Sequence, residues 1–393
     1  MPVRICFITN YAYRLFNRKS HLAFGCIETI FYIIAKDLSD DKRFEVNFLL
    51  EDDVHKNPVT EKINGITLYK TSRKIQPAVY QDKQIEKYHR WFTYWARKFS
   101  WLWQWPHLDF FRLWENLRQI NADIYIFASP GYESGLITFL ARIMKKKSVY
   151  LVVNDEELYR PINNFKDKIF YFGLKHANIV WCLSVRHQTI LKNRHNLKAI
   201  NLPCWLFRPK KILPLEKRHY ILWAGRIDPH KHPAAFIKLA RRLPRLKFLM
   251  IVAASPNEPV LFKSIVKSGT KIPNLKLKQE VMFTDVGRYY ERALALIDTS
   301  DYKNLNMTVL QAAYYKVPCL SLFEDPENSF NEYQWGLSAN GDIKKMIDNI
   351  NKVIGSPREW KKLATNGYLF ANKIYNPEAN LTKFKNLMLL LSK

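Results

Sequence analysis

Two cations that follow a glycine turn are the residues whose types and spacing best suit chemistry. Gly225 lies at the end of an apolar run that begins at Tyr220, Arg226 follows at once, and Lys231 comes five positions later. A helical stretch begins near Pro233. A strand, a glycine turn and a helix N-terminus would gather two cations and a positive helix end at one point, which suits a diphosphate. The alternative is an ordinary connection with two solvated cations.

The elements around this turn alternate between strands and helices. In the second half we expect strands at 220–224, 247–253, 281–283, 296–298 and 318–322, with helices at 233–242, 288–296 and 307–316. In the first half we expect strands at 3–9, 44–50, 124–127, 148–153 and 179–182, with helices at 25–38, 135–144 and 186–194. This alternation predicts two parallel, doubly wound α/β sheets, with ligands bound where the strands end.

The expected domains meet at a charged, proline-containing linker, residues 206–218. We expect a first domain at 1–205, a second at 206–375, and an amphipathic helix within 376–393. Ligands of two facing sheets would then lie in a cleft between the domains.

The segment from Ile297 to Pro318, taken with Gly225, Arg226 and Lys231, resembles the donor-binding signature of family 4 glycosyltransferases. The resemblance implies the GT-B fold, which has two facing Rossmann-like domains and a last helix that crosses back to the first. It implies a nucleotide-sugar donor and no other cofactor. The resemblance assigns the donor-binding positions to Gly25, Gly225, Lys303, Asn306, Met307, Thr308 and Gln311. Arg226 and Lys231 would stabilise the leaving diphosphate without a metal ion.

Three positions of the signature depart from the family. Lys303 and Gln311 stand where the family has two acidic residues eight positions apart, and Lys316 replaces the glycine of the final turn. The Gln311 amide can still bond ribose hydroxyls. A cation at Lys303 would bind a phosphate or an acidic sugar, or it marks an enzyme that no longer turns over. Asp301 is close enough in sequence to substitute in part.

The first domain offers fewer candidates. Only Gly25 remains of the glycine pair that the family has after its first strand. Asp155 follows a central strand and is our third catalytic candidate, in contact with the donor sugar or the acceptor. A helix N-cap is the alternative for Asp155. The acids between Glu324 and Glu327 lie beyond the signature, and we expect a solvated loop there.

Composition limits the partners. The chain has 393 residues, with 62 Lys and Arg against 35 Asp and Glu, so its net charge is +27. This excess predicts an acidic partner such as a phosphorylated substrate or an anionic membrane surface. Nucleic acid is disfavoured, since no zinc finger, basic zipper or RNA-recognition motif is present. Five scattered cysteines and no spanning segment favour a cytoplasmic protein, peripheral to the cytosolic face of a membrane.

An aromatic and basic segment, residues 87–118, interrupts the first domain. It contains six of the eleven tryptophans, with arginines and lysines interleaved. This composition suits the headgroup region of a membrane, stacking on sugars or bases, or the packing of a helical insert into the first domain.

Together these features predict a retaining, metal-independent glycosyltransferase that acts on a glycan or a lipid-linked glycan. Two alternatives stay open: an inactive relative that serves as a binding subunit, and a basic nucleic-acid-binding protein. The donor sugar, its base, the linkage and the oligomeric state do not follow from the sequence.

Overall fold

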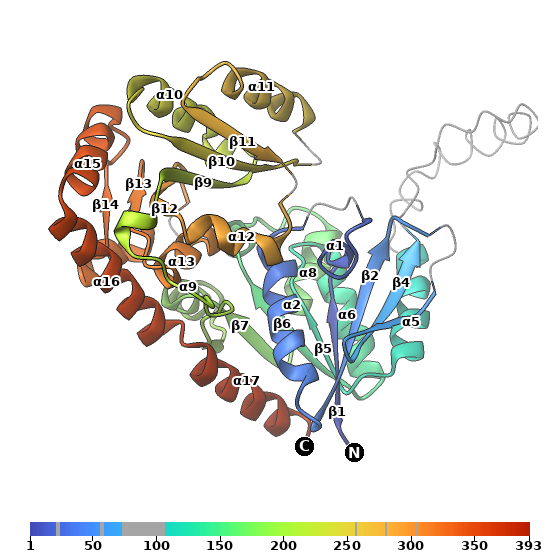
Figure 1. Ribbon diagram of the computed structural model, residues 1–393. Helices are drawn as coiled ribbons and strands as arrows, with labels where there is room; N and C mark the ends of the chain where they lie inside the picture. Colours follow the sequence, from blue (N-terminus) through green and yellow to red (C-terminus); the bar gives the residue numbers. More distant parts are fainter. Residues whose placement is uncertain (21–23, 56–58, 73–106, 256–257, 280, 303–304) are drawn as a thin grey trace, which may run out of the picture.

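The computed structural model describes residues 1–20, 24–55, 59–72, 107–255, 258–279, 281–302 and 305–393. The chain forms two α/β domains, each built on one sheet (Figure 1). The first sheet has eight strands in the order β3-β4-β2-β1-β5-β6-β7-β8, and the second has six in the order β11-β10-β9-β12-β13-β14. All strand pairs are parallel except the pair of β3 with β4.

The described elements of the first domain are, in chain order, β1 (Val3–Ile8), α1 (Tyr13–Phe16), α2 (Cys26–Ser39), β2 (Phe44–Asp52), β3 (Glu61–Ile63), β4 (Ile66–Ser72), α5 (His107–Ile120), β5 (Ile124–Phe127), α6 (Tyr132–Ile143), β6 (Lys147–Val152), α7 (Asp155–Tyr159), α8 (Phe165–His176), β7 (Ile179–Cys182), α9 (Val185–His195) and β8 (Ala199–Asn201). The inner strands β5 and β7, each flanked by a strand on both sides, are buried along their whole length. This is the pattern of parallel strands that helices cover on both faces.

The described elements of the second domain are β9 (Tyr220–Arg226), α10 (Pro233–Arg242), β10 (Phe248–Ala253), α11 (Pro259–Gly269), β11 (Leu275–Gln279), α12 (Phe283–Tyr290), β12 (Ala293–Asp298), α13 (Met307–Tyr314), β13 (Cys319–Ser321), α14 (Ser329–Tyr333), β14 (Gly336–Ser338), α15 (Ile343–Gly355) and α16 (Pro357–Ile374). Three single 3-10 turns accompany them: η1 (Leu215–Lys217), η2 (Pro229–Lys231) and η3 (Pro326–Asn328).

The expected order of elements differs from the structure around residue 280. A strand lies at Leu275–Gln279, which we did not predict, and helix α12 begins at Phe283, where we expected the strand 281–283 to end. The residues expected to form a helix at 288–296 instead close α12 and begin strand β12 at Ala293. The alternating Leu275–Gln279 run is a half-exposed edge strand, whereas our assignment favoured continuous apolar residues.

The linker between the domains is held to the second domain by hydrogen bonds. Arg218 is 4% exposed, and its guanidinium donates to the backbone carbonyls of Leu213, Tyr290, Ala293 and Tyr315. Burial lowers the pKa of Arg218 to about 10. A charge surrounded by carbonyl oxygens therefore fixes the end of the linker to the second domain.

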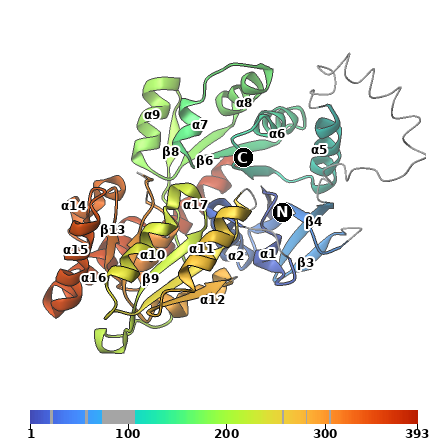
Figure 2. The same cartoon turned by 90° about the horizontal axis from the view of Figure 1, so that it is seen from above.

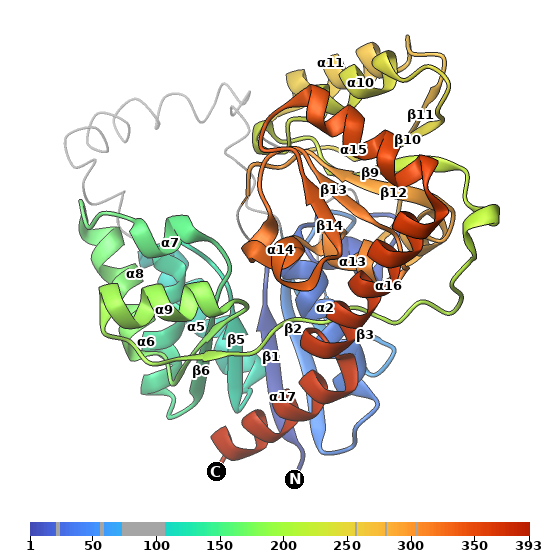
Figure 3. The ribbon, with the colours of Figure 1, turned by 90° about the vertical axis from the view of Figure 1, so that its left-hand side faces the viewer.

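The last helix, α17 (Pro377–Leu391), returns to the first domain, as expected from the family resemblance. Phe384 packs its ring against Trp181 and Trp205, with centroids 5.6 and 6.3 Å away, and Lys385 pairs with Asp41 at 2.9 Å. Figure 3 shows α16 following the second domain and α17 continuing down onto the first. The two chain ends consequently lie near each other beside the first sheet (Figure 1).

Candidate functional site

The turn after β9 is shaped by the absence of a side chain at Gly225. A Cβ at Gly225 would lie 3.1 Å from Cδ of Lys231, so the lysine stem packs directly over the glycine. The Thr299 hydroxyl donates to the Lys231 carbonyl at 2.5 Å, and the Trp223 indole donates to the same hydroxyl at 2.9 Å. Lys231 is thus held by its backbone and its stem, and its ammonium lies 5.9 Å from the centroid of the Tyr302 ring.

Arg226 lies where the two domains touch. Its Nε donates to Asp228 at 3.2 Å, and its side chain remains 41% exposed. A Cβ built on Gly25 would lie 3.4 Å from a terminal nitrogen of Arg226. The structure therefore brings Gly25, from the first domain, to the predicted pair Arg226 and Lys231 of the second.

The first domain presents a helix end at the same place. Gly25 precedes α2, and its amide donates to Glu28 at 2.7 Å. The Thr9 hydroxyl donates to the other oxygen of Glu28 at 2.9 Å, so the carboxylate joins the end of β1 to the beginning of α2. Cys26, the next residue, is exposed, and the positive charges of Arg226 and Lys231 are close enough to act on the pKa of its thiol. An anion here would face two side-chain cations and a helix N-terminus.

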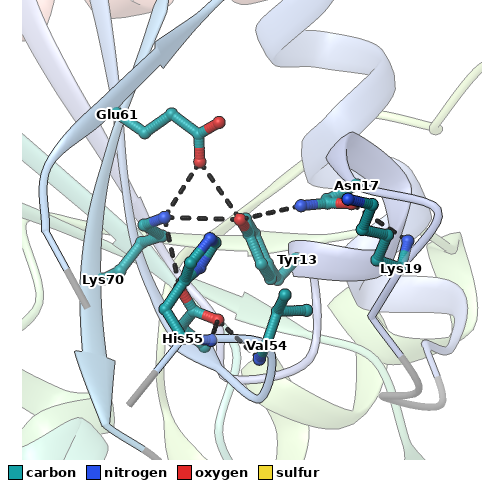
Figure 4. Close-up of polar contacts among 8 residues, drawn as sticks. Tyr13, Asn17, Lys19, Val54, His55, Glu61 and Lys70 are labelled. Atoms are coloured by element: carbon teal, nitrogen blue, oxygen red, sulfur yellow. Dashed lines mark hydrogen bonds and ion pairs between the residues drawn. The ribbon is translucent and has the colours of Figure 1, made fainter. Parts of the chain in front are cut away.

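A buried ionic network holds the connection between β1 and α2 (Figure 4). The Tyr13 hydroxyl donates to Glu61 at 3.1 Å and accepts from Asn17 at 3.0 Å. Lys70, whose side chain is 2% exposed, pairs with Asp52 at 3.1 Å and with Glu61 at 2.9 Å. Burial lowers the pKa of Lys70, but hydrogen bonds with Glu61, Asp52 and Tyr13 outweigh it, so the net pKa is raised. Lys70 is a fixed cation that positions α1.

The helix α13 begins with a polar cap that includes several predicted residues. Asn306 accepts from the Val309 amide at 3.0 Å and from the Thr308 hydroxyl at 2.5 Å. The Asn306 amide in turn donates to buried Asp298 at 2.8 Å. The side chains of Asn306 and Thr308 therefore build the helix N-terminus, and a direct contact with the donor stays a prediction.

Met307 and Gln311 lie one helical turn apart on α13. The Cys204 thiol approaches the Met307 sulfur at 3.8 Å, which places Met307 beside the connection between the domains. Gln311 is half-exposed on the same face of the helix. Lys303 lies outside the described residues. Lys316 adopts φ of +53°, so the turn after α13 has a left-handed residue even without glycine.

Asp301 joins two histidines to which we assigned no role from the sequence. It pairs with His232 Nε2 at 3.1 Å and with His230 Nδ1 at 3.6 Å, while the Asp301 amide donates to the His230 carbonyl at 3.1 Å. These contacts tie the loop after β12 to the turn that carries Lys231. The sequence signal was the pattern His-Lys-His at 230–232, which we left unassigned.

Asp155 is braced within the first domain. It accepts from His187 Nε2 at 3.0 Å and pairs with Arg186, both from α9. Burial raises the pKa of Asp155, but the hydrogen bond and charge of Arg186 outweigh it, so the net pKa is lowered. Asn154, rather than Asp155, occupies the N-cap position of α7, so the N-cap alternative was wrong by one residue. Whether Asp155 also touches a substrate stays a prediction.

Glu327 is a residue that the sequence analysis missed. It adopts φ of +54°, and its carboxylate accepts from the Leu305 amide, immediately before Asn306. Desolvation raises the pKa of Glu327, while the Leu305 amide and the charge of Arg186 oppose the rise. Asp325 accepts from the Phe330 and Asn331 amides at 2.8 and 3.0 Å. Glu324 and Glu327 are exposed, as expected for a solvated loop, and the Glu327 carboxylate also accepts from the amide that precedes the N-cap of α13.

The predicted aromatic segment is only partly described. Residues 87–106 lie outside the described part, and residues 107–118 belong to α5. Phe110, Leu113 and Trp114 pack against the core of the first domain. Among the described residues, no group of three or more His, Cys, Asp and Glu side chains could hold a metal ion. The described helices include none with the length and hydrophobicity that crossing a bilayer requires.

Comparisons with known proteins bear on this arrangement. Residues 207–370 match the family model of the Glycosyl transferases group 1. The chain is similar in structure to sucrose-phosphate synthase from Thermosynechococcus elongatus, with a TM-score of 0.70 and 13% identity over 99% of both chains. It is also similar to HepE from Anabaena, solved with UDP and glucose, with a TM-score of 0.68 and 12% identity over 98% of this chain and 99% of that one.

A glycosyltransferase from Rickettsia africae ESF-5 is a third similar structure, with a TM-score of 0.65 and 12% identity over 100% of this chain and 99% of that one. None of the curated proteins searched matches the sequence. The structural likenesses confirm the expected two-domain GT-B fold.

Proposed function

We propose that this chain, whose residues 207–370 match the family model of the Glycosyl transferases group 1, transfers a sugar from a nucleotide-sugar donor to a glycan or lipid-linked glycan. The observation that carries the proposal is the meeting of Gly25 with Arg226 and Lys231 between the domains. Fixed cations and a helix end at one point are what a leaving nucleoside diphosphate requires.

Each residue has a separate task in this proposal. Arg226 and Lys231 neutralise the charge that develops on the diphosphate as the bond between sugar and oxygen breaks. The capped N-terminus of α13 adds backbone N–H groups at the same place. Gln311, one turn along α13, bonds the ribose hydroxyls. Because two cations already neutralise the diphosphate, the transfer proceeds without a metal ion. By the family resemblance, it retains the configuration at the anomeric carbon of the sugar.

The nucleotide to test first is a uridine diphosphate sugar, since the structurally similar HepE was solved with UDP and glucose. The acceptor is a glycan or lipid-linked glycan, and the net charge of +27 supports this choice because it favours an anionic membrane surface, where a lipid-linked glycan would lie.

One observation supports a second candidate, an inactive relative that binds a nucleotide. Lys303 replaces the first acid of the family signature, as the sequence shows. A cation at this position would strengthen the binding of phosphates without helping the transfer.

A panel of nucleotide sugars distinguishes the two candidates. For a transferase, one donor should raise the melting temperature by mass action and release nucleoside diphosphate slowly in the absence of acceptor. The inactive relative would show the shift in melting temperature with no release. If no nucleotide sugar shifts the melting temperature, both candidates are wrong.

The variant Lys303→Glu tests the role of the replaced acid. If Lys303 binds a donor phosphate or an acidic sugar, charge reversal should weaken donor binding by more than about 1 kcal/mol, the scale for hydrogen bonds to charged groups. Titration calorimetry measures this, with Gln311→Glu as a companion that should be tolerated. An unchanged affinity in Lys303→Glu would show that Lys303 points to solvent.

A further inference from the structure

The outer side of the first domain has two helices that approach closely. A Cβ at Gly173, in α8, would lie 2.7 Å from Cα of Gly135, in α6, so the helices touch at their backbones. This contact brings the rings of Phe139 and Phe172 side by side on the outer surface, with centroids 6.3 Å apart. The ring row extends to Phe110 of α5, whose centroid is 6.4 Å from that of Phe139. Figure 2 shows α5, α6 and α8 next to one another along one side of this domain.

Large apolar side chains on this surface remain in contact with solvent. Phe139 is 41% exposed and Ile143, one turn further along α6, is 51% exposed. Phe172 is half-buried and stacks on His176, with centroids 4.3 Å apart. Single exposed apolar residues are ordinary on protein surfaces, but a contiguous group marks a site of interaction.

Cations surround this apolar row. Arg142 and Lys145 are exposed at the end of α6, and Lys168 and Lys175 are exposed on α8. Residues 139–147 contain no acid, and the one acid of α8, Asp167, is buried and paired with Arg160 at 2.7 Å. Aromatic rings with interleaved long cations match the headgroup region of an anionic bilayer, where stems and rings enter the interface and charges meet lipid phosphates.

The position of the surface relative to the candidate site is also suitable. Helix α6 follows the carboxyl end of β5 and α8 follows α7, so both helices begin at the sheet edge that carries Gly25 and Asp155. The row itself lies in the second halves of these helices, since Phe139 and Phe172 are each the eighth of twelve residues in α6 and α8. A lipid-linked head group would reach the candidate site by passing around this edge.

We propose that this surface, made of Phe139, Arg142, Ile143, Lys168, Phe172 and Lys175 and called here the α6–α8 face, docks the protein on an anionic membrane. The docking itself is independent of catalysis. The delivery of a lipid-linked acceptor to the first domain rests on the proposed function.

The test is co-sedimentation with phosphatidylcholine vesicles that contain or lack phosphatidylserine. The wild-type protein should bind the anionic vesicles, and binding should fall as salt is raised. The double variant Phe139→Glu/Ile143→Glu should bind at least about tenfold more weakly, since it removes two apolar anchors and adds two repelled charges. Both side chains are exposed, so folding should be preserved, which circular dichroism and a thermal melt verify.

The matched control is Val260→Glu/Leu369→Glu, on α11 and α16. These residues are 80% and 59% exposed, so the control makes the same charge change on the other domain. It should bind vesicles as the wild type does. The proposal is overturned if the wild type ignores anionic vesicles, or if both double variants bind equally well. It is also overturned if the α6 variant changes only the oligomeric state, which would make the face a protein interface.

Nucleotide binding by the same variants separates this proposal from the function. The α6 variant should keep the melting shift of the wild type with a nucleotide sugar. If neither the wild type nor the variants bind a nucleotide sugar, but the α6 variant alone loses vesicle binding, the proposed function is wrong and the docking surface is supported.

Discussion

Two strand-to-helix connections face each other between the domains, and they are built in opposite ways. The connection from β1 to α2 is held by the buried charges of Lys70 and Asp52 and by the partly exposed Glu61. The connection from β9 to α10 is held by its backbone and by packing on Gly225, and it leaves Arg226 41% exposed. In the first connection the charged side chains hold the backbone in place. In the second, the Arg226 charge stays accessible to a ligand. Loss of a cation should therefore affect stability in one case and activity in the other.

The largest effect is expected when the buried cation is removed. Lys70→Met would leave the fully buried Asp52 carboxylate without its cation, which costs about 3–5 kcal/mol of unfolding free energy. Urea denaturation measures this. The control Lys62→Met changes an exposed lysine of β3 and should be nearly neutral. Adding Asp52→Asn to Lys70→Met should recover part of the loss, and equal stability of the wild type and Lys70→Met would refute the scaffold role.

The second effect concerns the exposed cations. Arg226→Ala and Lys231→Ala should each lower turnover about a hundredfold or more, the scale for losing one group that stabilises developing charge. Melting temperatures should stay close to that of the wild type, because the Arg226 side chain is partly exposed and Lys231 is held through its backbone. The rate of release of nucleoside diphosphate measures turnover. Full activity in either variant would refute the diphosphate assignment of that residue.

The smallest effect is a pH dependence of the scaffold. Hydrogen bonding to Lys70 lowers the pKa of Glu61, and the pKa of Asp52 is also lowered, because the Val54 amide, His55 and Lys70 outweigh its burial. Since folding lowers both pKa values, the stability they contribute is complete above their ordinary values near 4 and is lost as the pH falls below them. Glu61→Gln should reduce stability at neutral pH by about 0.5–1 kcal/mol, as for a partly exposed ion pair.

Denaturation at a series of pH values measures this difference. The gap between the wild type and Glu61→Gln should shrink as the pH falls below about 4. A gap that stays constant with pH would show that Glu61 contributes packing rather than charge.

The two connections also differ in how far the sequence predicted them. Gly225, Arg226 and Lys231 are neighbours in sequence, so their spacing was enough to predict that they converge. The scaffold joins Tyr13 to Lys70, which are 57 residues apart on different elements. No local periodicity links such residues, so this network could only be found in the folded chain.

Other discrepancies have the same origin. The close contact of Gly135 with Gly173 depends on the packing of two helices and had no local signal. Glu327 meets Leu305 only because consecutive residues 327 and 328 adopt positive φ, which is uncommon for side chains other than glycine. Strand β11 was missed because an edge strand needs only one apolar face, and a pattern of alternating lysines was not recognised as such.

The central claim, that Arg226 and Lys231 hold a diphosphate, is tested most directly by calorimetry with two nucleotides that share a base. The wild type should bind the nucleoside diphosphate at least about tenfold more tightly than the monophosphate, a difference of about 1.4 kcal/mol. The double variant Arg226→Ala/Lys231→Ala should bind both nucleotides with similar affinity. If the double variant keeps the wild-type preference for the diphosphate, the β-phosphate is bound elsewhere and the account is wrong.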